Sequence, residues 1–218
     1  MVSWLVIRDG NKDSEALTAF ASACRDHGKS IQIVKDANVR TKQYAEQALL
    51  NAGPVDAIIY WPVVADGLGQ EDGTEGEVLF EGTVRGLFHI LRSGVSVATS
   101  PTKFVLVTST LGARGVPGQG YRCAALHGCE GMMEAASIEF SDLGHFCLCF
   151  DIGVGSDADE VANNLYTGIN STGEVLEDLS SHSRSIVGGE HARAAVRDQL
   201  RWLSEEIEDW KFLTVQDS

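Results

Sequence analysis

The first place where this sequence could bind a phosphate group is residues 8–15, between a short apolar run and an amphipathic segment. Phosphate binding at such a turn needs several glycines, because backbone N–H groups and the helix N-terminus must reach the phosphate oxygens. The turn has a single glycine, Gly10. Carboxylates stand where a pyrophosphate would lie: Asp9, Asp13 and Glu15. Arg8 and Lys12 offset this negative charge only in part, so the sequence predicts that no dinucleotide binds here.

A second candidate segment follows the apolar run 104–107. Ser109 ends the run, and Tyr121 follows a loop of regularly spaced turn residues. These loop residues are Gly112, Gly115, Gly118 and Gln119. The order resembles the short-chain dehydrogenase/reductase superfamily, in which a strand ends in serine and a glycine-spaced loop leads to Tyr-x-x-x-Lys. The resemblance implies a tyrosine acid/base, a serine that orients the carbonyl group, and a lysine that lowers the tyrosine pKa.

The lysine of that pattern is missing. Without a gap, Arg122 takes the tyrosine position and Leu126 the lysine position. With a one-residue deletion, Tyr121 takes the tyrosine position and Ala125 the lysine position. Neither alignment supplies an ammonium group to acidify a phenol whose ordinary pKa is about 10. We therefore predict that Ser109 and Tyr121 are degenerate remnants, and we assign no catalytic or cofactor-binding residue.

Metal binding is not predicted either. The five cysteines have no C-x-x-C spacing, and Cys147 and Cys149 would share one face of a strand, which suits packing. The six histidines have no pair four residues apart with a carboxylate between them. Cys123 is predicted near a helix N-terminus, which lowers a thiol pKa, but no base accompanies it.

Short apolar runs alternate with amphipathic segments along the first 170 residues. The runs are residues 4–7, 31–34, 56–61, 104–107 and 146–150. Helices are predicted from about residues 14, 41, 74, 123 and 157, with Tyr44 and Phe88 on the apolar faces of the second and third. Continuously apolar strands separated by helices predict a parallel sheet that is covered on both faces. The expected fold is α/β: a doubly wound, mostly parallel, truncated Rossmann-like sheet in three αβα layers.

Length and charge narrow the function classes. The 218 residues suit a single domain over 1–218. The net charge of -14, from 17 basic and 31 acidic residues, argues against nucleic acid and against anionic membranes as partners. No apolar run approaches the roughly 18 residues of a membrane span, and no signal sequence is visible at the N-terminus. A cytoplasmic location is therefore expected.

Several segments in order resemble the structural, N-terminal subdomain of modular polyketide synthase ketoreductases. They are residues 4–7, 53–61, 124–131 with 138–140, and 150–152, within a similarity that covers roughly residues 3–200. That subdomain lacks the glycine-rich turn and the catalytic residues. The resemblance implies a pseudo-ketoreductase that is not catalytic by itself. It would stabilise and position a catalytic half, which binds the NADPH, beside neighbouring synthase domains in polyketide biosynthesis. The alternative is a divergent NADP(H)-dependent reductase of a ketone or β-ketoacyl thioester.

The C-terminal segment carries an apolar stripe in an acidic context. Val196, Leu200, Leu203, Ile207 and Trp210 recur at helical spacing, although residues 190–210 also suit a hairpin. An acidic extension is expected at about residues 203–218. The candidate interface with a partner consists of Leu200, Trp202, Leu203, Ile207 and Trp210. The stripe could equally close the core of the domain itself.

Overall fold

The protein is described by a computed structural model, which covers residues 3–10, 14–35, 41–66, 76–98, 101–110, 119–153 and 156–171. Its elements in chain order are β1 (Ser3–Arg8), α1 (Glu15–Asp26), β2 (Ser30–Lys35), α2 (Lys42–Ala52), β3 (Ala57–Tyr60), the 3₁₀ turn η2 (Val63–Asp66), α3 (Gly76–Val97), β4 (Lys103–Ser109), α5 (Gly120–Ser141), β5 (Phe146–Ile152) and α6 (Ala158–Asn170).

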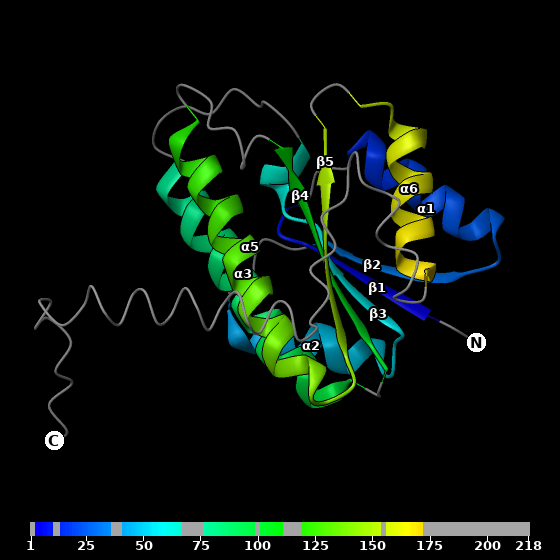
Figure 1. Cartoon of the computed structure of the whole chain (residues 1–218), viewed down its shortest axis with the longest axis horizontal. Helices are drawn as coiled ribbons and strands as arrows, with labels where there is room; N and C mark the ends of the chain where they lie inside the picture. The colour runs from blue at the N-terminus through cyan, green and yellow to red at the C-terminus, as the bar shows by residue number, and fades with distance from the viewer. Residues whose placement is uncertain are drawn as a thin grey trace, which may run out of the picture.

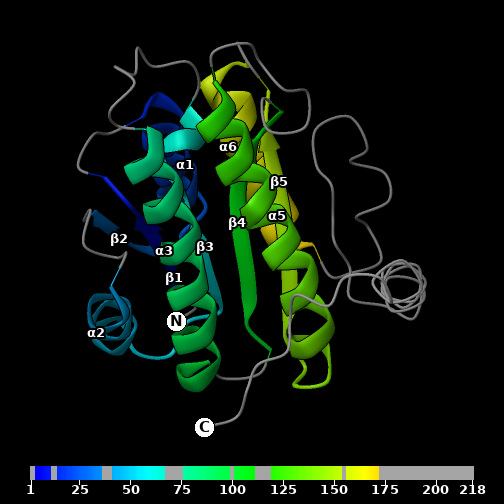
Figure 2. The same cartoon turned by 90° about the vertical axis from the view of Figure 1, so that its left-hand side faces the viewer.

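The five strands form one parallel sheet in the order β2-β1-β3-β4-β5. Helices α1 and α6 cover one face, and α2, α3 and α5 cover the other (Figure 1). The view in Figure 2 shows α3 and α5 side by side in front of the sheet. The prediction of a doubly wound, parallel, three-layer Rossmann-like fold is confirmed.

Alternation along each strand divides the core into two layers. In β1, Leu5 and Ile7 pack toward α3 and α5, whereas Trp4 and Val6 pack toward α1 and α6. All four side chains are almost fully buried. A strand that is buried on both faces reads as a continuous apolar run, which is why the sequence pattern identified these strands.

Local signals fix the ends of the first helix. The Ser14 hydroxyl accepts a hydrogen bond from the backbone N–H of Leu17 at 3.1 Å and so caps the N-terminus of α1. Gly28 follows the helix with φ +69°, a left-handed conformation that glycine adopts without strain. Both residues were predicted to bound the helix, and its expected apolar stripe is buried: Leu17, Phe20, Ala21 and Cys24.

Two aromatic residues do not lie where the sequence pattern predicted. Tyr44 on α2 is 42% exposed and Phe88 on α3 is 46% exposed, so neither belongs to the core. On α3 the buried stripe passes through Leu87, Ile90 and Leu91, one residue away from Phe88. Gly86 and Gly94 lie on the same inner side of α3, where an added Cβ would meet Tyr60 and Phe104, and Phe88 lies on the outer side.

No helix in the described part of the chain is long and apolar enough to cross a membrane. The acidic extension at 203–218, the candidate interface residues and the helix-or-hairpin question at 190–210 lie outside the described residues.

Candidate functional site

Doubly wound sheets bind ligands beyond the carboxyl ends of their strands, at the point where the strand order reverses. In this sheet the reversal lies between β1 and β3, because β1 leads outward to β2 and β3 leads the other way to β4. We call the carboxyl ends of β1 and β3 the switch-point region. The residues that close these two strands therefore decide whether a nucleotide could bind.

Asp9 is the first of these residues, and its carboxylate is used inside the protein. It is only 4% exposed. Its Oδ2 accepts hydrogen bonds from the Tyr60 hydroxyl at 3.1 Å and from the Thr83 hydroxyl at 3.0 Å. Its Oδ1 accepts from the backbone N–H of Val63 at 2.7 Å. The donors come from β3, α3 and η2, so one buried charge joins three elements at the switch point.

Arg8, next to Asp9, contacts the other end of turn η2. Its buried guanidinium pairs with Asp66, the last residue of η2. The indole N–H of Trp61 also donates to Asp66, at 3.0 Å. Turn η2 is thus held at both ends by side chains from the end of β1.

The Val63 side chain of η2 comes very close to Gly10 in the turn after β1. A Cβ atom placed on Gly10 would lie 2.4 Å from Cγ2 of Val63, closer than two carbon atoms can approach. Gly10 is therefore needed for the packing of η2, and not as one of several glycines around a phosphate. Together, the Asp9 network and η2 occupy the switch-point region with the protein's own atoms.

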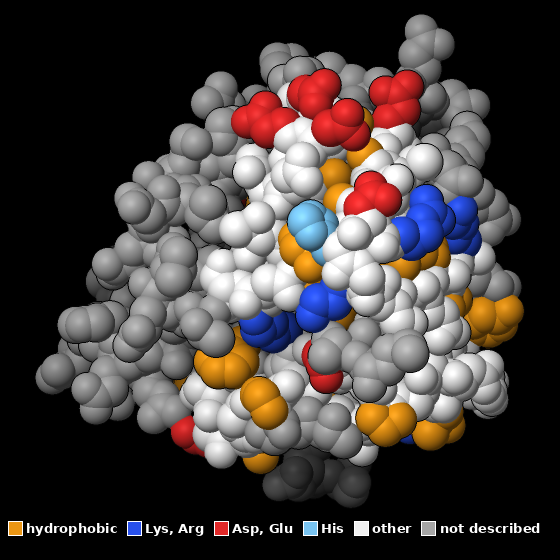
Figure 3. Space-filling view, turned by 90° about the vertical axis from the view of Figure 1, so that its right-hand side faces the viewer, with side chains coloured by type: hydrophobic (Ala, Val, Ile, Leu, Met, Phe, Trp, Pro, Cys, Tyr) orange, Lys and Arg blue, Asp and Glu red, His pale blue; other side chains and the backbone are white. Residues whose placement is uncertain are grey.

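The N-terminus of α1, the usual place for a pyrophosphate, is also unfavourable. The Ser14 hydroxyl already takes one of its free N–H groups, and Glu15 puts a carboxylate in the first turn. Asp157 caps the neighbouring helix α6 by accepting from Asp159 N and Glu160 N, each at 3.0 Å. Acidic side chains gather at one end of the surface seen in Figure 3.

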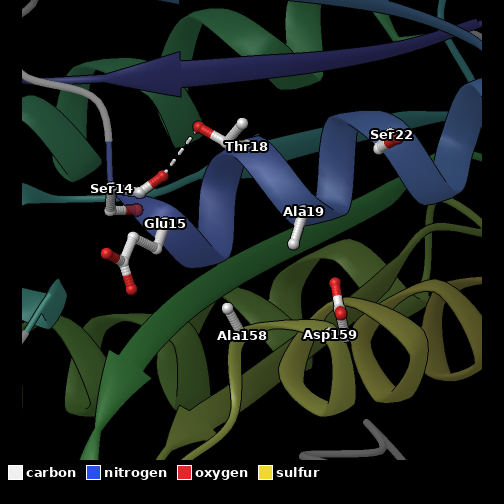
Figure 4. Close-up of a pocket in the computed structure, with 7 residues that line it drawn as sticks. All are labelled: Ser14, Glu15, Thr18, Ala19, Ser22, Ala158 and Asp159. Carbon is white, nitrogen blue, oxygen red and sulfur yellow. Dashed lines mark hydrogen bonds between the residues drawn. The ribbon is translucent and has the colours of Figure 1, made fainter.

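A shallow cleft lies between the N-terminal turns of α1 and α6. Its lining residues are Ser14, Glu15, Thr18, Ala19, Ser22, Ala158 and Asp159 (Figure 4). Carboxylates come from both helices, Glu15 from α1 and Asp159 from α6. The negative field of these groups opposes an anionic ligand.

The two remnants of a reductase pattern lie on the expected elements but in opposite environments. Ser109 closes β4 and is 1% exposed, whereas Tyr121 lies in the first turn of α5 and is 54% exposed. Ala125 and Leu126, the two candidate lysine positions, are buried apolar residues, and α5 contains no lysine. The described surroundings therefore supply no α5 ammonium group to either hydroxyl.

A polar cluster that sequence reasoning missed joins β4 to α5. The Thr108 hydroxyl donates to Oε1 of Glu130 at 2.9 Å, and Nδ1 of His127 lies 3.4 Å from Oε2 of the same carboxylate. The Glu130 carboxylate therefore holds the end of β4 against α5. Thr108 is fully buried, so its hydroxyl is not available to a molecule in solvent. Only the i,i+3 spacing of His127 and Glu130 was visible in the sequence.

No metal site is present among the described residues, where no group of three potential ligands comes together. Cys147 and Cys149 do share one face of β5, as predicted, and both are buried in the core. Burial raises the pKa of Cys147 to about 12 and raises the pKa of Cys149 well above its ordinary value. These thiols are packing residues.

The fold is shared with solved structures of short-chain dehydrogenases/reductases. One is a short-chain dehydrogenase/reductase family oxidoreductase from Aeromonas hydrophila. It superposes with a TM-score of 0.66 over 80% of this chain and 94% of its own, at 11% sequence identity. A second, from Vibrio parahaemolyticus, gives a TM-score of 0.62 over 74% and 91%, at 15% identity. A third, BdcA in complex with NADPH, gives 0.58 over 78% and 87%, at 10% identity.

No family model matches the sequence, and no curated protein matches it significantly. At these identities the likeness to the solved structures shows the fold alone. The chain thus has the fold of the short-chain dehydrogenases/reductases, with a switch-point region that is filled by Asp9, its hydrogen-bond donors and η2.

Proposed function

We propose that this chain is a non-catalytic member of the short-chain dehydrogenase/reductase type, a pseudo-ketoreductase that acts as a structural subdomain. Its partner is the catalytic half of a polyketide synthase ketoreductase, which it stabilises and positions. NADPH binds to that partner and not to this chain. The observation that carries the proposal is the buried Asp9 carboxylate, whose three hydrogen bonds occupy the place where a dinucleotide would enter.

Two further observations support the proposal. The N-terminus of α1 is capped by Ser14 and carries Glu15, so its partial positive charge is already compensated. The exposed phenol of Tyr121 and the buried hydroxyl of Ser109 have no lysine on α5 to complete an acid/base group. Each of these features alone would weaken catalysis, and together they support a chain that neither binds the cofactor nor donates the proton.

A divergent NADP(H)-dependent reductase is the second candidate. Ser109 at the end of β4 and Tyr121 at the start of α5 occupy the elements that the reductase pattern requires. In this candidate function the substrate is a ketone or a β-ketoacyl thioester. NADPH binding to the chain itself separates the two candidates.

The test is a titration of the full chain with NADPH, followed by nicotinamide fluorescence and by calorimetry, with an active short-chain reductase as the positive control. We expect no saturable binding tighter than about 100 µM, which corresponds to roughly -5.5 kcal/mol. Saturable binding below that concentration would overturn the proposal and favour the divergent reductase.

The partner role needs a second measurement. The chain is co-expressed with a catalytic ketoreductase half, and the complex is assayed for NADPH-dependent reduction. Ser109→Ala and Tyr121→Phe should leave the rate within a few-fold of the unmodified complex. Loss of a true acid/base group would lower it about 10²- to 10⁴-fold. A loss of that size with the fold intact would place the catalytic residues in this chain, and failure of the two halves to associate would contradict the structural role.

A further inference from the structure

The sheet ends in β2 on one side and in β5 on the other, and these two strands differ in composition (Figure 1). Strand β2 carries polar side chains: Ser30 and Gln32 are exposed, and Lys35 closes the strand. Polar and charged residues are a common protection of an edge strand against unwanted pairing. Strand β5 instead reads Phe-Cys-Leu-Cys-Phe over residues 146–150, and the last four of these residues are buried. In composition, β5 is therefore an interior strand.

The outward backbone groups of β5 lead to the same conclusion. The N–H of Phe146 donates to the carbonyl of Thr102 at 3.1 Å, on the side of β4. Alternate residues of a parallel strand direct their N–H and C=O groups to opposite sides, so those of Cys147 and Cys149 point away from β4. Among the described strands β5 pairs with β4 alone, and no described residue hydrogen-bonds to these outward groups.

Water has little access to these groups. Cys147 is 2% exposed and Cys149 is 4% exposed. Buried backbone N–H and C=O groups are almost always hydrogen-bonded, because an unpaired one costs the free energy of its lost hydration. The outer side of β5 therefore requires a further strand.

Outside the described residues, one run has the composition of such a strand. Residues 212–215 read Phe-Leu-Thr-Val. Leaving glycine aside, this is the only run of four there in which every residue is apolar or β-branched, as strand residues usually are. It follows Lys211 and so begins with Lys-Phe, as β4 does. The competing run, Ile186 and Val187, is two residues long and is followed by two glycines.

The segment before this run also fits. A helix precedes each strand from β2 to β5. The apolar positions Leu203, Ile207 and Trp210 recur at helical spacing directly before the run. The alternation that defines the described fold thus continues to residues 211–215, where the next strand is expected.

The chain between the described residues and this run is long enough. Nζ of Lys103 donates to the carbonyl of Ser171 at 2.9 Å, and Lys103 is the register partner of Phe146. The described chain therefore ends beside the amino end of β5. Residues 172–210 would span roughly 130 Å if fully extended, whereas a strand of seven residues such as β5 is roughly 23 Å long. The run can thus reach either end of β5.

We propose that residues 211–215 form a sixth strand, which pairs with the outer side of β5 in the same chain. Its backbone hydrogen-bonds to the outward N–H and C=O groups of Cys147 and Cys149. The end of the chain then belongs to the sheet of this domain. This inference does not depend on the proposed function. The competing occupants of the edge are residues 186–187 and a second copy of the chain.

Nuclear Overhauser effects (NOEs) between backbone protons test the pairing in the unmodified full chain. We expect NOEs that join β5 to residues 211–215. NOEs from β5 to a different segment, or to no further strand, would overturn the proposal. A mixture of isotope-labelled and unlabelled chains detects pairing between molecules. NOEs that join β5 of one chain to residues 211–215 of another would assign the strand to a second copy and would also overturn it.

Amide hydrogen exchange tests the effect of the strand on β5. Leu213→Pro together with Thr214→Pro removes one N–H group from each side of the run. The amides of Cys147 and Cys149 should then exchange at least about tenfold faster, because their partner strand is lost. The inward amide of Leu148 should keep its protection. Unchanged exchange at Cys147 and Cys149 would contradict the pairing.

Ile186→Pro together with Val187→Pro is the matched control and should leave the exchange of β5 unchanged. Faster exchange at Cys147 and Cys149 in this variant alone would assign the edge to residues 186–187 and overturn the proposal. Loss of protection at Leu148 marks a variant that has unfolded, and the NOEs of the unmodified chain then decide.

Discussion

His145 shows how much a single buried side chain can depend on its protonation state. Its Nδ1 accepts a hydrogen bond from the backbone N–H of Thr102 at 3.3 Å, which requires an unprotonated nitrogen. Its ring packs edge-on against Phe104 and Phe140, and only 7% of the residue is exposed. Burial lowers the pKa of His145 below its ordinary value of 6.5. The neutral imidazole therefore joins the loop before β5 to the start of β4.

This arrangement predicts that the protein loses stability in weak acid. In the unfolded chain His145 takes up a proton near pH 6.5, whereas in the folded chain it does so only at lower pH. Its contribution to stability is thus complete above pH 6.5 and is lost as the pH falls through the folded value. Urea unfolding of the full chain at pH 7.5 and 5.5 should show a lower free energy of unfolding at pH 5.5.

His145→Asn keeps an acceptor near the position of Nδ1 but does not titrate, so it should reduce the difference between the two pH values. His89→Asn removes the other described histidine with a lowered pKa and should reduce it further in the double variant. A pH difference that survives both substitutions in full would contradict the assignment.

At the level of residues, the sequence identified the charged side chains of the turn after β1 but not the residues that hydrogen-bond to them. From Asp9 and Glu15 the sequence predicts a turn after β1 that disfavours phosphate, and the structure shows that the Asp9 carboxylate is buried. The donors to Asp9, Tyr60 and Thr83, lie 51 and 74 positions away in the chain, and no local pattern links them. Their meeting depends on the packing of α3 against β3, which periodicity does not describe.

Among the elements, α3 owes its position to two glycines that face the sheet. A Cβ on Gly86 would lie 2.9 Å from the Tyr60 hydroxyl oxygen, and one on Gly94 would lie 2.7 Å from Cε1 of Phe104. The close approach also brings the Thr83 hydroxyl to Asp9. Sequence periodicity located the helix but assigned Phe88 to its inner face, because it weighs large apolar side chains and not the small residues that permit contact.

Gly94→Ala should therefore destabilise the protein. Its Cβ would collide with the ring of Phe104, which is itself held by Phe140 and His145, so we expect a loss of about 1–3 kcal/mol. Gly168→Ala on α6 is the matched control, because nothing lies within 4 Å of the added Cβ. Alanine there should stabilise by about 0.5–1 kcal/mol through its better helix propensity. Thermal and urea unfolding measure both, and equal effects would rule out the close contact.

Strands and helix ends were predicted well, since buried parallel strands and capping residues leave local signatures. The sequence did not predict that η2 lies at the switch-point region, because this turn consists of four residues without a periodic pattern. Turn η2 owes its place to Asp9 and to the Arg8–Asp66 pair, and these contacts exist only in the folded chain.

For the molecule as a whole, the reactivity of the cysteines measures how well the core excludes solvent. All five lie in the described part of the chain as free thiols, and four are buried. Burial raises the pKa of Cys24 and of Cys147 to about 12 and raises those of Cys129 and Cys149 well above the ordinary value. Only Cys123, near the start of α5, is partly exposed.

Titration of the native protein with a thiol reagent at pH 7.5 should thus modify one cysteine quickly and four slowly. Thiolate is the reactive form, and the buried thiols supply almost none of it. All five should react after unfolding in urea, and Cys123→Ser should abolish the fast phase. Two or more fast thiols in the native protein would mean that one of the two core layers opens readily.

The dual use of Asp9 limits how this protein can change. A substitution that cleared the switch-point region by removing the carboxylate would also leave the hydroxyls of Tyr60 and Thr83 without their acceptor and would release η2. Adding glycines to the turn would leave this network in place unless those residues were replaced at the same time. Substitutions at positions in direct contact are strongly non-additive, so each single step would lower stability before any binding could appear. Clearing the switch-point region would therefore need several substitutions at once, in β1, β3 and α3 together.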